Sequence, residues 1–350
     1  MSKPWLTIIG GGLAGLSLCD ELLSIYKSRG EPLPGEIVIL EQRHQYTNDR
    51  TFCFFATQPP DDVRYQSYDN WTFSLAGNCS GHKQNGSKYQ YFRLAAGDVY
   101  DTLLGRIENS PQVQLVTGVS ADTQGLQDSH VVDTRPCQPS DMWIKQCFAG
   151  VEVETKNTWD TSTAQLMGNM RLEDGRFTFD YILPMPDNRA LVEVTQFTAD
   201  PPGTDKLKGY LQKTLSGLEV NTDSLRQESA VLPMGIVRHS DNRLFSQQIR
   251  TATGYGYLET KRWAQRCAKN IVNQQKPDYH PQSTLLRWFD ARLLHIIENR
   301  PEHLPTIFMS MAKQLSGDEF ARFISSPSFA SLLKVMRSVP KQPFLRTLYD

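Results

Sequence analysis

Three glycines near the N-terminus have the spacing of a turn that binds phosphate. Gly10, Gly12 and Gly15 lie between a short apolar segment and an amphipathic one, which predicts a strand, a tight turn and a helix. Gly10 permits the turn, Gly12 lets the backbone approach a pyrophosphate, and Gly15 lets helix and strand pack closely. We expect Ala14, in the same turn, and Glu41, at the end of the next apolar segment, to complete a dinucleotide site in which Glu41 accepts the ribose hydroxyls. The alternative is a glycine-rich turn with a purely structural role.

A second candidate for chemistry is a single acid in an apolar segment. Residues 189–197 alternate as in a β-strand, and this places Leu191, Glu193, Thr195 and Phe197 on one face. A carboxyl group among apolar neighbours loses the hydration of its charged form, so its pKa rises and it can donate a proton near neutral pH. We therefore interpret Glu193 as a general acid. From the residues alone, an ion pair between Glu193 and an arginine inside the sheet is the alternative.

Neighbouring acids and aromatic residues receive different interpretations. Glu152 and Glu154 alternate with valines, so we expect these two acids on a solvated face. Phe177, Phe179 and Tyr181 recur at every second position, and their ring faces are able to stabilise a cation near Glu193. Plain core packing is the commoner role for such rings.

The elements that must position these residues are of two kinds. A strand at 5–9, a helix at 16–26 and a strand at 36–41 make one βαβ unit around the glycines. The segment 151–197 alternates and is rich in Val, Thr, Phe and Tyr, which predicts an antiparallel sheet. Apolar residues with helical spacing follow, in the segments 206–215, 256–275, 285–297 and 307–311.

Composition and charge exclude several classes of protein. The chain has 350 residues, of which 39% are hydrophobic and 21% are charged, and its formal net charge is −1. These values are typical of a globular protein, and no basic patch indicates nucleic-acid binding. The six cysteines form no Cys-x-x-Cys pair and have no histidine at ligand spacing, so we expect reduced thiols, a cytoplasmic location and no metal site. We expect no signal peptide and no spanning helix, so any membrane contact is peripheral.

A series of short segments occurs in the order of one family's motifs. Asn-Asp-Arg-Thr-Phe-Cys-Phe-Phe at 48–55 is similar to the family's Asn-Asp-Arg-Thr-Trp-Cys-Phe-Trp. The other segments are 131–136, 146–150, 180–184, 190–197, 228–234 and 253–256. On these motifs, which run from residue 5 to about 275, the chain resembles the lycopene β-cyclases, bacterial carotenoid enzymes with a flavin fold.

The resemblance implies a fold and a cofactor. The fold is of the α/β class, with an FAD-binding, Rossmann-like domain of the aromatic-hydroxylase kind, an antiparallel-sheet substrate domain and a C-terminal helical region. Their expected bounds are 1–60, 90–137 and 225–275 for the FAD-binding domain, 61–89 and 138–224 for the substrate domain, and 276–350 for the helical region. Reduced FAD is the expected cofactor, with NAD(P)H as its reductant. Arg50, Thr253, Gly254 and Tyr255 would lie beside the flavin.

The resemblance also implies a redox-neutral reaction. Protonation of a terminal double bond of lycopene gives a cation that attacks a second double bond, and loss of a proton completes a β-ionone ring of γ- or β-carotene. Glu193 occupies the position of the family's acid, while Val194 replaces the second acid of the plant-type motif.

The substrate implies a partner surface. Lycopene and related polyenes dissolve in the bilayer, so the protein is expected at the inner face of the cell membrane. A segment from 285 to 315 has the pattern of an amphipathic helix that docks there, although an ordinary helical core has the same pattern. Its apolar residues include Trp288, Phe289, Phe308, Met309 and Met311.

Two places depart from the family's pattern. Between 235 and 250 the family's glycine-rich turn beside the flavin is missing, which predicts weaker FAD binding. Asn169 stands where the family commonly has Asp, which predicts the loss of a carboxylate beside the pocket. Two alternatives to a cyclase therefore stay open: a flavin-dependent oxidoreductase, such as a prenyl reductase or a monooxygenase, and a degenerate relative that binds a polyene without converting it.

Overall fold

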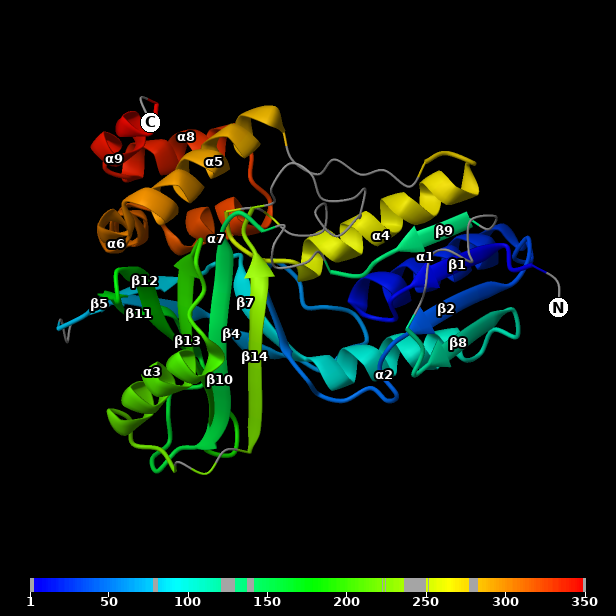
Figure 1. Ribbon diagram of the computed structural model, residues 1–350, viewed down its shortest axis with the longest axis horizontal. Helices are drawn as coiled ribbons and strands as arrows, with labels where there is room; N and C mark the ends of the chain where they lie inside the picture. Colours follow the sequence, from blue (N-terminus) through cyan, green and yellow to red (C-terminus); the bar gives the residue numbers. More distant parts are fainter. Residues whose placement is uncertain are drawn as a thin grey trace.

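A parallel sheet at the N-terminal end of the molecule carries the glycine motif (Figure 1). The computed structural model describes residues 3–77, 81–120, 130–136, 142–221, 223, 225–235, 250, 252–276 and 283–348. The order of the parallel strands is β8-β2-β1-β9. Their bounds are β1 (Leu6–Ile9), β2 (Ile37–Glu41), β8 (Val113–Thr117) and β9 (His130–Asp133). All four side chains of β1 are buried, as its apolar sequence predicts.

Three helices pack around this sheet. They are α1 (Leu13–Arg29), α2 (Ala96–Ile107) and α4 (Tyr257–Val272), and α1 contacts the other two. The apolar face of α1, with Leu18 and Leu22, and Trp263 of α4 share one core with Ile8 and Ile39 of the strands. The predicted βαβ unit is confirmed, and α1 begins directly after Gly12.

A seven-stranded sheet forms the other half of the molecule. Its order is β14-β10-β13-β12-β11-β5-β6, and it is antiparallel except where β11 pairs with β5. The bounds are β5 (Asn70–Leu75), β6 (His82–Asn85), β10 (Lys145–Glu154), β11 (Thr163–Glu173), β12 (Arg176–Met185), β13 (Arg189–Thr198) and β14 (Arg226–Pro233). The antiparallel sheet that alternation predicts over 151–197 is therefore confirmed.

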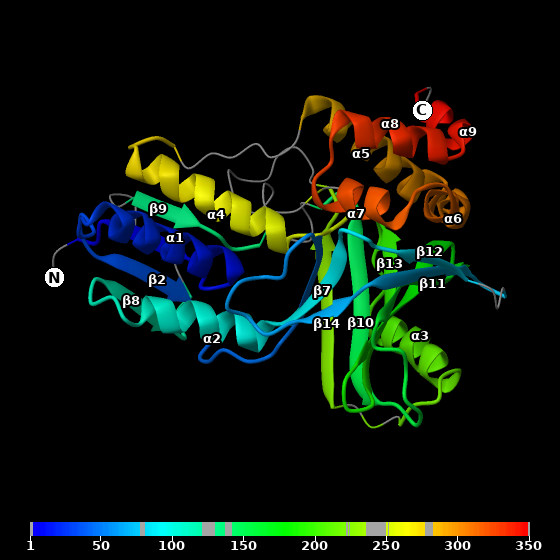
Figure 2. The ribbon, with the colours of Figure 1, turned by 180° about the vertical axis from the view of Figure 1, so that it is seen from behind.

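Both faces of the seven-stranded sheet are covered (Figure 2). One face packs on α3 (Thr204–Ser216) through Val192 and Val194. The other packs on the C-terminal helices through Leu191 and Phe197. Those helices are α5 (Thr284–Asn299), α6 (Leu304–Gln314), α7 (Gly317–Ser325), α8 (Phe329–Ser338) and α9 (Lys341–Arg346). The period-two alternation of β13 thus separates two apolar cores.

A three-stranded sheet, in the order β3-β7-β4, connects the two halves. Its strands are β3 (Thr51–Ala56), β4 (Gln66–Tyr68) and β7 (Gln90–Ala95). Phe54 and Phe92 belong to the core of the parallel sheet, whereas Phe55 and Tyr91 belong to the core under the C-terminal helices. The division into three domains at the expected bounds stays a prediction.

Candidate active site

The glycine turn brings a helix start close to a strand end. Gly10 has a φ of +96°, which favours glycine, and a Cβ at Gly15 would lie 1.9 Å from the carbonyl oxygen of Gly10. Only glycine at position 15 lets α1 approach the turn this closely. The backbone N–H groups at the start of α1, behind Gly12, lie at the positive end of the helix dipole. This cradle fits the pyrophosphate of a dinucleotide.

Glu41 lies beside this turn and is anchored to it. Its carboxylate accepts hydrogen bonds from the Gly11 N–H (2.7 Å) and from the backbone N–H (2.8 Å) and Nε (3.0 Å) of Arg43. The Arg43 guanidinium also donates to the Gly11 carbonyl (3.1 Å) and lies over the rings of Tyr46 and Tyr100, 4.7 and 5.0 Å from their centroids. Sequence reasoning missed Arg43, which follows the strand-end acid by two positions. The ribose contact of Glu41 stays a prediction.

A large cavity begins at this turn and continues to the C-terminal helices. It encloses about 2260 Å³, including space that opens to solvent. Gly12, Leu13 and Ala14 line one part of it, and Glu193 and Glu228 line another. The two features that the sequence singled out separately are therefore parts of one cavity.

The residues expected beside a flavin also line this cavity. Arg50 has 54% of its side chain exposed and pairs with Asp49 at 2.7 Å. The backbone from Thr253 to Tyr255 borders the same space, and Gly254 has a φ of +69°. Sequence reasoning placed these residues on one site, and the fold brings them to one cavity; their contact with a flavin stays a prediction.

Glu193 lies in the middle of β13, and only 7% of it is exposed. Its cross-strand partner is Gly150 on β10, and Gly150 is also the cross-strand partner of Glu228 on β14. The two glutamates therefore lie on either side of a residue without a side chain, and both line the same cavity. Burial, together with the nearby Glu228 carboxylate, raises the pKa of Glu193 well above its usual value. The predicted rise of this pKa is confirmed.

Glu228 is held from the opposite side by cationic and hydroxyl groups. Arg226 donates to Glu228 and, through Nη2, to Thr51 Oγ1 at 2.8 Å. The Thr51 hydroxyl donates in turn to Glu228 Oε2 at 3.0 Å. Sequence reasoning missed Glu228 as a site residue, although it begins one of the family-like segments. Its meeting with Glu193 depends on the register of three strands, which no local pattern shows.

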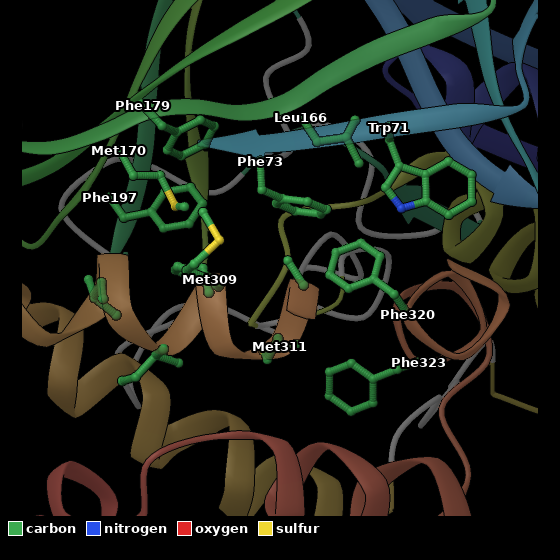
Figure 3. Close-up of a cluster of buried hydrophobic side chains, with 14 of the residues drawn as sticks. Trp71, Phe73, Leu166, Met170, Phe179, Phe197, Met309, Met311, Phe320 and Phe323 are labelled. Atoms are coloured by element: carbon green, nitrogen blue, oxygen red, sulfur yellow. The ribbon is translucent and has the colours of Figure 1, made fainter. Parts of the chain in front are cut away.

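The walls near the carboxyl groups are aromatic. The hydroxyl group of Tyr181, the cross-strand partner of Glu193, hydrogen bonds to that of Tyr91 (2.8 Å), and the Tyr91 hydroxyl in turn hydrogen bonds to that of Tyr255 (3.1 Å). Phe179 and Phe197 line the cavity beyond them, and Figure 3 shows these two rings and Phe73 opposite Met309 and Met311 of α6. Of the three rings expected near Glu193, Phe179 and Tyr181 line the cavity, whereas Phe177 is buried against Phe179, Phe197 and Phe308.

Two expectations about polar neighbours are wrong. Glu152 is only 7% exposed, because it pairs with Arg226 (3.3 Å) and Arg189 (3.2 Å); Glu154 is exposed, as expected. Asn169 is absent from the cavity lining, and its amide instead donates to Asp180 at 3.0 Å. The presence of Asn at position 169, where the family commonly has Asp, therefore removes no carboxylate from the cavity. The shortened segment 235–250 lies, apart from its two ends, outside the described residues.

Solved structures share the fold. A geranylgeranyl bacteriochlorophyll reductase-like protein from Thermoplasma acidophilum is 10% identical over 99% of this chain and 98% of its own, with a TM-score of 0.59. HpxO from Klebsiella pneumoniae, complexed with FAD, is 11% identical over 97% and 100%, with a TM-score of 0.54. A 2-methyl-3-hydroxypyridine-5-carboxylic acid oxygenase is 13% identical over 97% and 99%, with a TM-score of 0.52. The predicted hydroxylase-like fold is thereby confirmed.

Sequence comparison identifies the family. Among curated proteins, no sequence matches the chain. A family model described as "Lycopene cyclase protein" matches residues 6–347, and this range includes the glycine turn, both glutamates and the C-terminal helices. With nearly the whole chain matched, the protein belongs to the lycopene cyclase family.

Proposed function

We propose that this chain is a lycopene β-cyclase that closes β-ionone rings on lycopene by proton transfer while reduced FAD is bound. The observation that carries the proposal is a single cavity that joins a dinucleotide turn to a buried carboxyl group with a raised pKa. Family membership supports the substrate class. A raised pKa keeps the Glu193 carboxyl protonated near neutral pH, as a proton donor requires.

In this proposal, Glu193 gives its proton to a carbon of a terminal double bond. The cation that forms takes the π electrons of a second double bond to make the ring's carbon–carbon bond, and a ring carbon then loses a proton. The chain's residues keep water away and stabilise positive charge. The faces of Phe179, Tyr181 and Phe197 line the space, and aromatic faces attract cations. No oxidant or reductant is consumed.

The cofactor would extend along the cavity from the glycine turn. Gly10, Gly12, Ala14 and Gly15 would hold its pyrophosphate, and Glu41 its ribose. Arg50 and the backbone at 253–255 would lie beside its ring system. Reduced FAD, generated with NAD(P)H, would supply an electron-rich ring system beside the cation.

Reconstitution of the purified chain tests the reaction type. The chain is loaded with FAD, reduced without oxygen, and supplied with lycopene in liposomes, while pigments and NADPH are measured together. Cyclic carotenoids without stoichiometric NADPH consumption are the expected result. One NADPH consumed per product would identify a flavin-dependent oxidoreductase instead. Lycopene that is bound and unconverted would identify a degenerate relative. The chain without flavin is the control.

We also propose that the protein docks peripherally on the membrane through its C-terminal helices. No helix within the described ranges is both long and apolar enough to cross a membrane. Large apolar side chains with 42–64% exposure lie on α5, α8 and α9: Leu285, Trp288, Phe329 and Leu345. The expectation that Phe308, Met309 and Met311 contribute to this docking surface is wrong, because all three side chains are buried beneath the sheet.

Liposome binding tests this surface. Trp288→Glu places a charge on the exposed face of α5, and we expect it to reduce co-sedimentation with anionic liposomes several-fold. Leu225→Glu is the matched control. Leu225 is 53% exposed just before β14, and the start of β14 lies at the end of the sheet away from the C-terminal helices (Figure 1). Equal binding by the two variants, or no binding by the parent chain, would contradict docking through α5.

A further inference from the structure

Two carboxyl groups in this cavity, those of Glu193 and Glu228, form a pair that the sequence alone does not predict. We propose that Glu228 is a positioning residue for Glu193: the pair shares one proton, with Glu228 as the charged half and Glu193 as the protonated half. The proposed role rests on the proposed cyclase function. The sharing of a proton is a property of the chain itself and can be measured without catalysis.

The backbone makes this pair possible at one position. Gly150 is the cross-strand neighbour of both glutamates, so the side chains on β13 and β14 meet over β10. A Cβ at position 150 would lie 2.5 Å from Cγ of Glu193, which is closer than carbon atoms approach without displacement. Any other residue at 150 would therefore push Glu193 away from Glu228.

The surroundings assign the charge to Glu228. Arg226 and the Thr51 hydroxyl both donate to it, and donors of this kind stabilise the ionised form of a carboxyl group. The side chains of Glu228 and Arg226 are 4% and 15% exposed, so solvent screens their attraction little. Glu193 receives the opposite influence, because the Glu228 carboxylate raises its pKa more than the Arg226 guanidinium lowers it. Two carboxyl groups this close do not both ionise readily.

The other titratable groups around the pair come from five strands. They are Tyr181 on β12, Cys53 on β3, Tyr91 on β7, Arg226 on β14 and Glu152 on β10, the last through its contact with Arg226. Burial raises the pKa of Cys53 to about 12 and the pKa of Tyr181 and Tyr91 well above the usual value. These thiol and hydroxyl groups are therefore neutral over the pH range in which the pair titrates.

A shared proton fits a reaction that takes up one proton and releases one. When Glu193 gives its proton to the polyene, the pair carries two negative charges beside the new cation and stabilises it. The repulsion between the two carboxylates then favours return of a proton to the pair when the ring carbon loses one. The pair regains its starting charge, and bulk solvent need not supply the proton.

The pH dependence of cyclisation tests the role of Glu228. Activity requires protonated Glu193, so it falls as pH rises through the pKa of that group. Glu228→Gln removes the neighbouring charge and lowers this pKa, so we expect the fall to move at least about one pH unit lower. Glu228→Asp keeps the charge and should restore part of the wild-type profile. Glu152→Gln, which removes the other carboxylate at Arg226, should keep the wild-type profile.

Infrared spectroscopy tests the shared proton separately from activity. The carbonyl stretch of a protonated carboxyl group is followed against pH in the parent chain, and the spectrum of Glu193→Gln is subtracted to isolate Glu193. We expect a band that persists to neutral pH in the parent and titrates at lower pH in Glu228→Gln. An unchanged midpoint in Glu228→Gln overturns the inference. A shifted midpoint in a chain that forms no rings supports the pair and rejects the cyclase.

Discussion

The seven-stranded sheet carries a buried carboxyl group on each of its faces, and the two groups are held in opposite ways. Asp180 faces α3 and is 5% exposed; it accepts from Arg171 (2.9 Å), Asn169 (3.0 Å) and Thr214 (3.1 Å). Glu193 faces the cavity with similar burial, and its carboxyl partner is another acid. The first arrangement satisfies a charge, whereas the second retains a proton. The partner, rather than burial, distinguishes a structural acid from a candidate proton donor.

Removing the charge on the α3 face should cost the most stability. Within the described residues, Asp180→Asn leaves Glu173 as the remaining carboxylate partner of the Arg171 guanidinium, and we expect about 3 kcal/mol of destabilisation. Urea denaturation measures this loss. Activity per folded molecule should stay at the parent level, because Asp180 does not line the cavity. A tenfold loss of activity in the folded variant would contradict the assignment of a purely structural role to Asp180.

Separating the acid pair should have the next largest effect. Gly150→Ala introduces a Cβ 2.5 Å from Glu193 Cγ, and we expect about 2 kcal/mol of destabilisation from overpacking. Cyclisation should fall more than stability does, because Glu193 is displaced from Glu228. Gly105→Ala in α2 is the control: among the described residues, no atom outside the nearby backbone of α2 lies within 4 Å of its Cβ, and we expect it to stabilise by roughly 0.5–1 kcal/mol. Full activity in folded Gly150→Ala would mean that the pair is not needed.

Two matched hydroxyl deletions should show the smallest and most specific difference. Thr51→Val and Thr214→Val each remove one hydroxyl that donates to a buried carboxylate, and each should destabilise by about 1 kcal/mol. Only Thr51→Val should change the pH dependence of cyclisation, since Thr51 contacts Glu228 and Thr214 contacts Asp180. Thermal unfolding and pH–rate profiles of both variants measure this. A shifted pH–rate profile in Thr214→Val, or an unshifted profile in both variants, would contradict the different roles of Glu228 and Asp180.

The parts of the site that depend on local order could be predicted from the sequence. The glycine spacing needs only a strand, a turn and a helix that are consecutive in the chain, and β1 and α1 follow it closely. The burial of Glu193, the larger cause of its raised pKa, likewise follows from the apolar residues that share its strand; the contribution of Glu228 does not.

The remainder depends on packing that no local pattern specifies. Glu228 is 35 positions from Glu193 and meets it only because β14 and β13 share β10 as a neighbour. Glu152 alternates like a solvent-facing residue, yet both faces of this sheet are covered, so the residue is buried and paired. The apolar spacing of α6 is the same for a membrane-facing helix and a core helix; here α6 packs on the strands beneath it.

The central claim is that Glu193 donates the proton that starts ring closure, and expression in lycopene-accumulating bacteria tests it most directly. Pigments from cells with the parent chain, Glu193→Gln and the exposed control Glu154→Gln are separated by chromatography, with equal amounts of folded protein verified. We predict γ- or β-carotene from the parent and from Glu154→Gln. Glu193→Gln should leave lycopene unconverted, because loss of a general acid lowers a rate by roughly 10²–10⁴-fold. Rings formed by Glu193→Gln at the parent level would contradict the assignment.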